Sequence, residues 1–436
     1  MNSADSESDP PLDLIIIGAG ISGVVALHYA RQAGLDVLLL ERQAVVGGLW
    51  ARLPPWQDIQ FGRLDWTLGD LPIAGEDQAN IRDNIQAWVD RFGLADRMRL
   101  GTEVTRAARA GNLWSVETRG AVYRARNLVC ATGGHNQPLI PNPRREAVTL
   151  HEVHSSALLD ARVLAGRDIA VVGGGASAYD LLDLCFEHGA RRVDWIYRQP
   201  RWMIPSRKPK SQIGGPRTLA KAQTELANVD DLSRVMHADL IARYEKFGLQ
   251  EILPSGTFHL GRDQIIPGRF RMIENYARIH RHRGEVSAIV GQEICISSGT
   301  SIKADLLLWG TGYEIDLSFF ANPELSRIKR HDQLCAQAGC GTRSVAEEGL
   351  YFTATVLEGS GTAPLAYALL ARTIMSHIRG TATLELEPLP GKVNHFEYAA
   401  FLAARDPASF PEGRWQEDLR RLAMEHPADQ PLPLPN

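Results

Sequence analysis

Two glycine-rich turns, each directly after a run of apolar residues, constrain the fold of this chain more than any other feature. The first turn is Gly18-Ala19-Gly20-Ile21-Ser22-Gly23, and the second is Gly173-Gly174-Gly175-Ala176-Ser177-Ala178. Glycine at these positions lets a buried parallel strand turn sharply into a helix, and it lets the backbone approach a pyrophosphate closely. A single turn of this kind could be ordinary helix-on-sheet packing. Two of them predict two dinucleotide-binding units in an α/β protein.

The apolar strand after each turn ends in a side chain that suggests which dinucleotide binds there. Glu41 follows the first of these strands. Its carboxylate would accept hydrogen bonds from ribose hydroxyls and repel a 2′-phosphate, so it favours FAD or NAD. Arg198 follows the second strand, with Arg201 close behind. A guanidinium can bind a 2′-phosphate through two parallel hydrogen bonds, so this half favours NADP(H). Ala178 in place of the third glycine is a variant that the fingerprint allows.

These motifs, taken with their order, resemble the flavin-containing monooxygenases. That family belongs to the class B flavoprotein monooxygenases, which also include Baeyer–Villiger enzymes and N-hydroxylases. The resemblance rests on the first turn, Glu41-Arg42 with Gly47-Gly48-Leu49-Trp50, Ala131-Thr132-Gly133, the second turn with Asp180, and Gly310-Thr311-Gly312-Tyr313. It implies bound FAD, NADPH as reductant and O₂ as cosubstrate. It also implies that a C4a-hydroperoxyflavin passes one oxygen atom to the substrate while NADP⁺ stays bound.

The chain departs from the family pattern between the two turns. The family usually carries Phe-x-Gly-x-x-x-His there, and only His154 of that motif is present, with Val148 and Leu150 at the Phe and Gly positions. The Baeyer–Villiger form, with Trp-Pro or Trp-Asp beyond the histidine, is absent. We therefore expect oxygenation at N or S of a small metabolite. Baeyer–Villiger oxygenation of a ketone, an NADPH-dependent flavin reductase and a redox-sensing binding protein remain alternatives.

The predicted fold class is α/β, with two dinucleotide-binding (Rossmann-like) domains and the NADP domain inserted into the FAD domain. Residues 1–155 are expected to form the first part of the FAD-binding domain, and residues 306–380 its second part. Residues 156–305 would form the NADP-binding domain, with a helical insertion at about 200–250. Residues 381–436 would form a Pro-rich helical cap. We also expect a helix at 78–92 and strands at 102–107, 114–118, 121–126, 127–130 and 350–354.

Composition narrows the classes of partner. The chain has 436 residues and a formal net charge of −4, so nothing favours nucleic acid or an anionic membrane as a partner. Its polar first ten residues are unlike a signal peptide. Five cysteines without framework spacing favour a reducing cytoplasm. We interpret Cys335 and Cys340 as separate thiols rather than a redox pair, and we expect no metal site. A homodimer is compatible with the sequence.

Side chains need to do little chemistry here because a flavin carries the oxygen activation. Gln60 is the best match for an amide near the flavin, Asp70 could pair with a cationic amine, and His154 could position the connector between the domains. Each also has a structural interpretation, as a loop glutamine, a turn cap and a packed linker histidine. The candidate cofactor-binding residues are Gly18, Gly20, Ile21, Ser22, Gly23, Glu41, Arg42, Gly48, Leu49, Trp50, Val104, Thr132, Gly133, Gly173, Gly175, Ser177, Ala178, Arg198, Arg201, Gly312 and Thr362.

Overall fold

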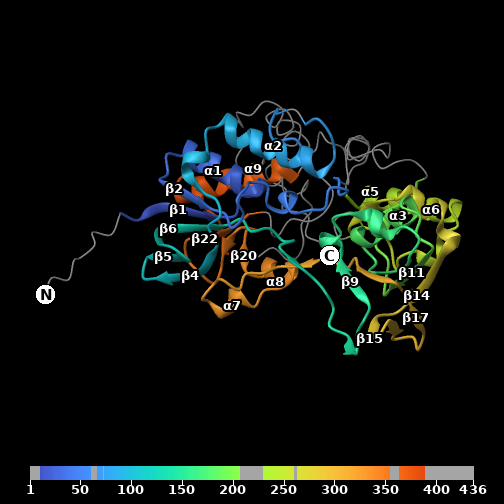
Figure 1. Ribbon diagram of the computed structural model, residues 1–436. Coiled ribbons are helices and arrows are strands. Elements are labelled where there is room, and N and C mark those ends of the chain that lie inside the picture. Colours follow the sequence, from blue (N-terminus) through green and yellow to red (C-terminus); the bar gives the residue numbers. More distant parts are fainter. Residues whose placement is uncertain are drawn as a thin grey trace.

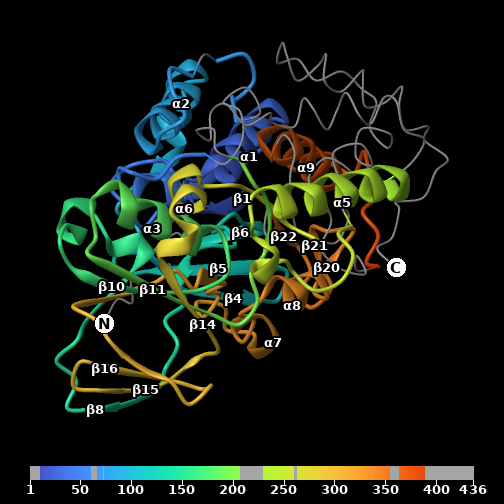
Figure 2. The same cartoon turned by 90° about the vertical axis from the view of Figure 1, so that its right-hand side faces the viewer.

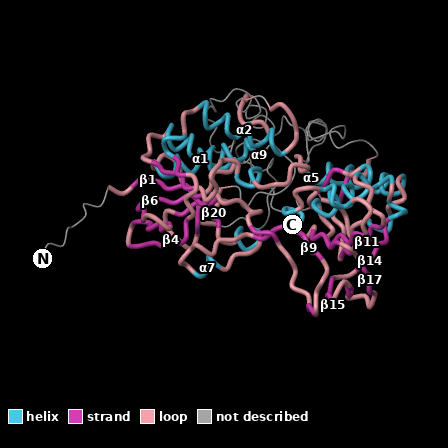
Figure 3. Tube along the Cα trace, in the orientation of Figure 1, coloured by secondary structure: helices cyan, strands magenta, loops and turns pink. Residues whose placement is uncertain are grey.

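The computed structural model describes residues 10–59, 66–71, 73–206, 229–259, 263–353 and 363–387. These residues form two α/β units that lie side by side (Figure 1). In each unit, strands gather into one central sheet and helices cover it (Figure 3). The glycine turns occupy equivalent places, since each follows a central parallel strand and opens a helix.

The first unit is built on a nine-stranded sheet with the order β20-β21-β22-β6-β1-β2-β3, to which the β4–β5 hairpin is joined through β6. Parallel pairing sets Ile17 at the end of β1 beside Leu40 of β2 and Cys130 of β6. The ends of these strands are apolar and buried, which is typical of a sheet covered on both faces. The strands are β1 (Leu12–Ile17), β2 (Val37–Leu40), β3 (Met98–Arg99), β4 (Val104–Ala110), β5 (Leu113–Thr118), β6 (Val122–Cys130), β20 (Ala338–Gly339), β21 (Arg343–Ser344) and β22 (Leu350–Phe352).

Helices α1, α2 and α9 lie together on one side of this sheet, with α7 and α8 near its other side (Figure 1). The helices are α1 (Ile21–Gln32), α2 (Gln78–Arg91), α7 (Pro323–Ser326), α8 (His331–Cys335) and α9 (Ala363–Ile378). The expected helix at 78–92 is therefore present. Strands β5 and β22 also match the expected strands closely, whereas the two strands expected at 121–126 and 127–130 are one continuous strand, β6.

The second unit has a five-stranded parallel sheet with the order β14-β11-β10-β18-β9. Its strands are β9 (His151–His154), β10 (Asp168–Val172), β11 (Arg192–Tyr197), β14 (Ile279–Arg283) and β18 (Leu306–Trp309). Helices α3 (Ala176–Glu187), α5 (Val229–Lys246) and α6 (Phe270–Glu274) lie on one side, together with the small β12–β13 sheet (Trp202–Ile204 and Ile265–Pro267). Helix α5 falls within the expected helical insertion, and residues 207–228 lie outside the described part.

A smaller four-stranded sheet packs against the other face of the second unit, away from α3 and α6 (Figure 2). Its order is β17-β16-β15-β8. The strands are β8 (Arg144–Glu146), β15 (Val286–Val290), β16 (Glu293–Ile296) and β17 (Ser301–Lys303). Two short strands that pair with each other, β7 (Gln137–Pro138) and β19 (Tyr313–Glu314), connect the two units.

The sequence boundaries at 155 and 305 are wrong, the first by two strands, β8 and β9, and the second by one, β18. β18 hydrogen-bonds to β10, and β9 hydrogen-bonds to β18, so both belong to the sheet of the second unit. The chain returns to the first unit only after Trp309. An apolar strand pattern indicates burial on both faces but does not say which sheet the strand joins. Residues 388–436, where the cap was expected, lie outside the described residues. No helix in the described part of the chain is long and apolar enough to cross a membrane.

Candidate active site

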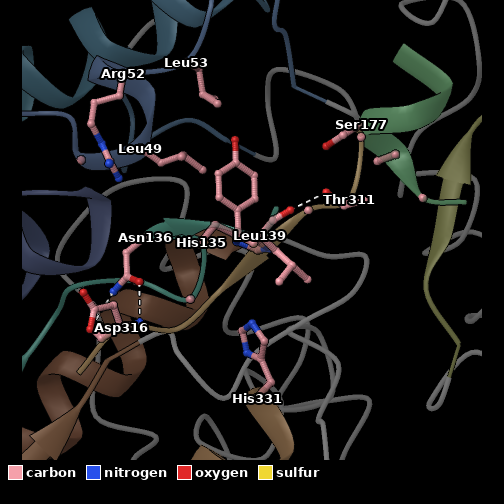
Figure 4. A pocket seen from close by; sticks show the side chains of 18 of the residues that line it. Leu49, Arg52, Leu53, His135, Asn136, Leu139, Ser177, Thr311, Asp316 and His331 are labelled. Carbon is pink, nitrogen blue, oxygen red and sulfur yellow. Dashed lines mark hydrogen bonds between the residues drawn. The ribbon is translucent and has the colours of Figure 1, made fainter. Parts of the chain in front are cut away.

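Both glycine turns line one cavity, with a volume of about 1680 Å³. The turns lie at the carboxyl ends of parallel strands, which is where open α/β sheets bind their ligands. Side chains from the two units face each other across this cavity: Leu49, Arg52 and Leu53 come from the first unit, Ser177 from the second, and Leu139 and Thr311 from the connecting segments (Figure 4).

The first turn brings backbone atoms, rather than large side chains, to the cavity. Gly18 has φ +108°, and a Cβ added there would lie 2.6 Å from the carbonyl oxygen of Ala131. Gly20 caps α1 without a side-chain hydrogen bond, so the first-turn N–H groups of α1 point at the cavity without a capping side chain. A second loop packs on this turn, because Gly47 N–H donates to Ala19 O (2.9 Å) and a Cβ on Gly48 would lie 2.7 Å from the Gly20 Cα. The close approaches at Gly18 and Gly48 leave no room for a Cβ, so these two positions of the cradle require glycine.

Glu41 is buried at the end of β2 and is held by the first turn. Its Oε2 accepts from Ala19 N–H (2.7 Å), and its Oε1 accepts from Gln43 N–H (2.8 Å). These bonds orient the carboxylate, and each oxygen keeps a further lone pair. The side chain is therefore positioned to accept hydrogen bonds from ribose hydroxyls at the cavity wall.

The second turn reproduces this cradle with one exchange of side chains. Gly173 has φ +135°, and a Cβ on Gly174 would lie 2.1 Å from the Gln199 carbonyl oxygen. Gly175 caps α3 without a side-chain hydrogen bond. Ala178 fits at the third position because the residue that follows the neighbouring strand β18 is Gly310, where a Cβ would lie only 2.7 Å from the Ala178 Cα. In the first turn the corresponding contact joins Gly23 and Ala131. There the glycine is on the helix and the alanine follows the strand, whereas in the second turn the alanine is on the helix and the glycine follows the strand.

Three arginines and one glutamate line the cavity beyond the second turn. Arg198 directly follows β11, and Arg283 is the last residue of the neighbouring strand β14. Arg201 lies near Gly175. Arg198 Nη1 lies 3.1 Å from Glu285 Oε1. This cluster is the most basic part of the second-unit wall and fits a phosphate group.

His154 lies behind the cavity wall at the end of β9 and does not line the cavity. Its Nδ1 accepts from Ser156 N–H (3.2 Å), so its Nε2 carries the proton and donates to Gly312 O (3.0 Å). Burial lowers the pKa of His154 below the ordinary value of 6.5, and the hydrogen bond to Gly312 opposes that shift. The neutral ring therefore supports the segment that carries Gly312 and Tyr313, whose ring packs edge-on against it.

Several cavity residues were missed by the sequence reasoning. Asn136 and Asp316 exchange hydrogen bonds across the connecting segments, from Asn136 Nδ2 to Asp316 O (3.1 Å) and from Asp316 N–H to Asn136 Oδ1 (2.7 Å) (Figure 4). His135 and His331 approach with ring centroids 5.8 Å apart. His135 and Asn136 follow Ala131-Thr132-Gly133-Gly134 directly, so proximity to that motif could have identified them. His331 had no such signal.

A second group joins the two units next to the cavity, and it includes Trp56, which was expected to line the substrate space but does not line the cavity. Trp56 of the first unit donates from Nε1 to Leu158 O of the second (2.6 Å) and packs against the second core. Asp58, which lines the cavity, interacts electrostatically with buried Arg269, and the Nε of Arg269 contacts Asp180 of α3. The Trp56–Leu158 hydrogen bond and the Asp58–Arg269 interaction therefore tie the loop after Trp50 to the second unit.

Most of the sequence-predicted residues do line the cavity. They are Gly18, Gly20, Ile21, Ser22, Glu41, Arg42, Gly48, Leu49, Trp50, Val104, Thr132, Gly133, Gly173, Gly175, Ser177, Arg198, Arg201 and Gly312. Gly23 and Ala178 are buried beneath the turns, where they pack helix on strand. Gln60 and Thr362 lie outside the described residues.

Asp70 is not part of the cavity, which corrects the expectation that it faces a substrate. Its side chain is 52% exposed and pairs on the surface with Arg91 of α2 (2.9 Å). Its place after Trp50 in the sequence suggested proximity to the cofactor, but Asp70 itself lies at the surface beside α2. Within the described residues, no cluster of three or more His, Cys, Asp or Glu side chains could hold a metal ion.

A family model for pyridine nucleotide-disulphide oxidoreductases matches residues 15–239, just over half of the chain. The chain belongs to this family. The name of these oxidoreductases refers to a disulphide, whereas none of the five cysteines of this member, all of which the structure describes, forms a disulphide bond.

Curated relatives of this oxidoreductase include flavin monooxygenases. It is 25% identical over 382 residues to the FAD-dependent monooxygenase resA of Aspergillus sclerotiorum, covering 72% of the chain and 66% of the relative. It is 24% identical over 351 residues to a Baeyer-Villiger monooxygenase of Streptomyces coelicolor, covering 69% and 64%. The chain spans between 40% and 70% of the length of such curated relatives.

Solved structures with the same fold include OTEMO in complex with FAD and NADP, with a TM-score of 0.67, 16% identity and 86% of each chain covered. An open structure of cyclohexanone monooxygenase matches with a TM-score of 0.66, 16% identity and coverage of 95% and 93%. A flavin-containing monooxygenase from Stenotrophomonas maltophilia matches with a TM-score of 0.62, 17% identity and coverage of 85% and 98%. The predicted fold class is confirmed, and so is the resemblance to the flavoprotein monooxygenases.

Proposed function

We propose that this chain is an NADPH- and O₂-dependent FAD monooxygenase that transfers one oxygen atom to nitrogen or sulfur of a small molecule. The observation that supports this proposal is that both glycine turns line the same cavity. Its volume of about 1680 Å³ exceeds the roughly 300–1,000 Å³ of a site for one small ligand. The similarity to proteins named as FAD-dependent and Baeyer-Villiger monooxygenases supports flavin chemistry in this cavity.

The residues present fit the two cofactors. The cradle of Gly18, Gly20 and Gly48, where a Cβ on Gly18 or Gly48 would collide with neighbouring backbone, would hold the pyrophosphate of FAD at the N-terminus of α1, and Glu41 would hold its ribose. The second turn would hold the pyrophosphate of NADPH at the N-terminus of α3, with Arg198 at its 2′-phosphate. When bound, FAD reduced by NADPH would activate O₂ and supply the transferred oxygen atom.

The chain's own residues position these ligands and keep water out. Leu49, Trp50 and Trp66 form an apolar part of the cavity wall, with the two indole rings edge-to-face at 5.4 Å. Apolar walls exclude water from the reacting atoms, which favours oxygen transfer over release of peroxide. Trp56 and the neutral His154 hold the two units and their connecting segment in register around the cavity.

Baeyer–Villiger oxygenation of a ketone is the second candidate, and the similarity to the Streptomyces coelicolor protein favours it. The sequence beyond His154 argues against it, since it lacks the Trp-Pro or Trp-Asp pair that the Baeyer–Villiger form carries. We therefore place amines and sulfides first and ketones second.

Turnover of the purified, flavin-loaded chain with NADPH and isotope-labelled O₂ tests the proposal. Amines, sulfides and ketones are offered separately, and mass spectrometry follows the label in each product. We expect one labelled oxygen in an N- or S-oxygenated product. A label found only in an ester would select the Baeyer–Villiger reaction. Peroxide formed in equal amount to the NADPH consumed with every compound would overturn the monooxygenase proposal in favour of a reductase.

A further inference from the structure

A carboxylate stands beside the arginine that would bind the 2′-phosphate. Glu285 lines the same cavity as Arg198, Arg201 and Arg283, and its Oε1 lies 3.1 Å from Arg198 Nη1. Both side chains are largely exposed to solvent, 58% for Glu285 and 78% for Arg198. Neither is locked in place by packing, so a ligand can compete for the arginine.

The backbone around Glu285 is held in place on both sides. Gly284 N–H donates to Tyr197 O at the end of β11 (2.9 Å), and Glu285 N–H donates to Ser297 Oγ (2.9 Å). Ser297 N–H in turn donates to Glu285 O (2.8 Å). Gly284 has φ +152°, and a Cβ there would lie 2.8 Å from both Ile296 Cγ2 and Ser297 Oγ. This turn therefore sets the carboxylate at the edge where Arg198 also emerges.

This edge combines the two features that normally separate the nicotinamide cofactors. An arginine favours the 2′-phosphate of NADPH, whereas a carboxylate accepts from the 2′-hydroxyl of NADH and repels a phosphate. Binding of NADPH brings a phosphate to Arg198 and therefore close to Glu285, where it competes for the arginine and is repelled by the carboxylate, whereas binding of NADH brings no such charge. We propose that Glu285 is a specificity-determining residue that narrows the preference for NADPH over NADH. This inference rests on the proposed use of a nicotinamide cofactor.

Calorimetric titration of the full-length, flavin-loaded protein with 2′,5′-ADP, 5′-AMP, NADP⁺ and NAD⁺ tests this role. Exposed ion pairs contribute up to about 1 kcal/mol, so we expect Glu285→Gln to tighten 2′,5′-ADP and NADP⁺ by about three- to fivefold. The same change should leave 5′-AMP and NAD⁺ unchanged or weaker. The gain should shrink at high salt, because the charges involved are exposed.

Glu274→Gln is the matched control, since Glu274 is an exposed glutamate of α6 in the same unit and does not line the cavity. It should change no affinity. Equal shifts for phosphorylated and unphosphorylated ligands in Glu285→Gln, or no shift at all, would overturn the role of Glu285 while leaving the proposed function intact. If the wild-type protein binds none of the four ligands, both the inference and the proposed function are overturned.

Discussion

Single residues decide whether the first glycine turn can form. A Cβ on Gly23 would lie 1.9 Å from the Gly18 carbonyl oxygen, so strand and helix would have to separate. We expect Gly23→Ala to lower the free energy of unfolding by about 1–3 kcal/mol, as overpacking does, and to reduce bound flavin. Thermal melting and the flavin-to-protein absorbance ratio measure both effects. Gly120→Ala is the control, because the structure describes no heavy atom within 4 Å of an added Cβ there. Equal flavin content in both variants would refute this role of Gly23.

Arg198 is the residue expected to distinguish NADPH from NADH. Loss of a charge-assisted contact to the 2′-phosphate costs about 1.5–3 kcal/mol. Arg198→Ala should therefore weaken NADPH binding by roughly ten- to a hundredfold and leave NADH nearly unchanged. Equilibrium titration of both cofactors checks this. Arg162→Ala removes an arginine that pairs only with exposed Asp160 outside the cavity, and it should change neither affinity. Equal losses for NADPH and NADH would instead indicate that Arg198 has a structural role.

At the scale of elements, neutral His154 stabilises the packing of β9 against the connecting strands β7 and β19. Burial lowers the pKa of His154, and a proton on Nδ1 would break the hydrogen bond that this atom accepts from Ser156 N–H. The unfolded chain therefore binds the extra proton more readily than the folded chain at acid pH. The stabilisation from neutral His154 is complete above about pH 6.5 and is lost as the pH falls through the lowered pKa.

We expect the free energy of unfolding to decrease less between pH 7 and pH 5 in His154→Gln than in the wild type, because glutamine does not titrate. Chemical denaturation at several pH values measures the two slopes. His280→Gln is the control, since His280 is an exposed histidine of β14 and its removal should leave the wild-type slope unchanged. Identical slopes in His154→Gln and the wild type would show that His154 does not contribute to the pH dependence.

At the scale of the whole molecule, the proposed function requires that the two units stay together around the shared cavity, so that oxygen transfer can compete with loss of peroxide. The Trp56–Leu158 hydrogen bond joins them. One hydrogen bond contributes a net of about 0.5–1.5 kcal/mol to the contact between the units. Trp56→Phe removes it and should therefore raise the peroxide released per NADPH by about two- to tenfold. Product per NADPH should fall, and flavin content should not change. A peroxidase-coupled assay beside product quantification measures this ratio.

Trp114→Phe is the matched control for that prediction. Trp114 also donates from Nε1 to a backbone carbonyl, that of Glu348 (3.3 Å), but both residues lie within the first unit. Its loss should affect stability without affecting the yield of peroxide. If both variants release equal extra peroxide, the effect would reflect general loosening rather than contact between the units.

Much of the molecule could be predicted from local sequence. Gly18, Gly20, Gly173 and Gly175 directly follow buried strands, and Gly18 and Gly173 have positive φ angles that favour glycine, so their place in the cavity could be predicted without knowledge of distant contacts. Glu41 and Arg198 were predicted for the same reason, because each directly follows a strand whose end must lie beside a turn.

Only the tertiary structure decided which elements come together. β18 joins the second sheet, Asp70 turns away to Arg91, and Glu285 reaches Arg198 across 87 positions of chain. The third glycine position of each turn likewise depends partly on local sequence and partly on tertiary structure. The sequence determined that a small residue was needed there, whereas the neighbouring strand decided between Gly23 and Ala178, because the side chain that fits depends on the residue opposite, Ala131 or Gly310. Periodicity and turn chemistry act over a few residues, but packing across a cavity depends on atoms that are distant in sequence.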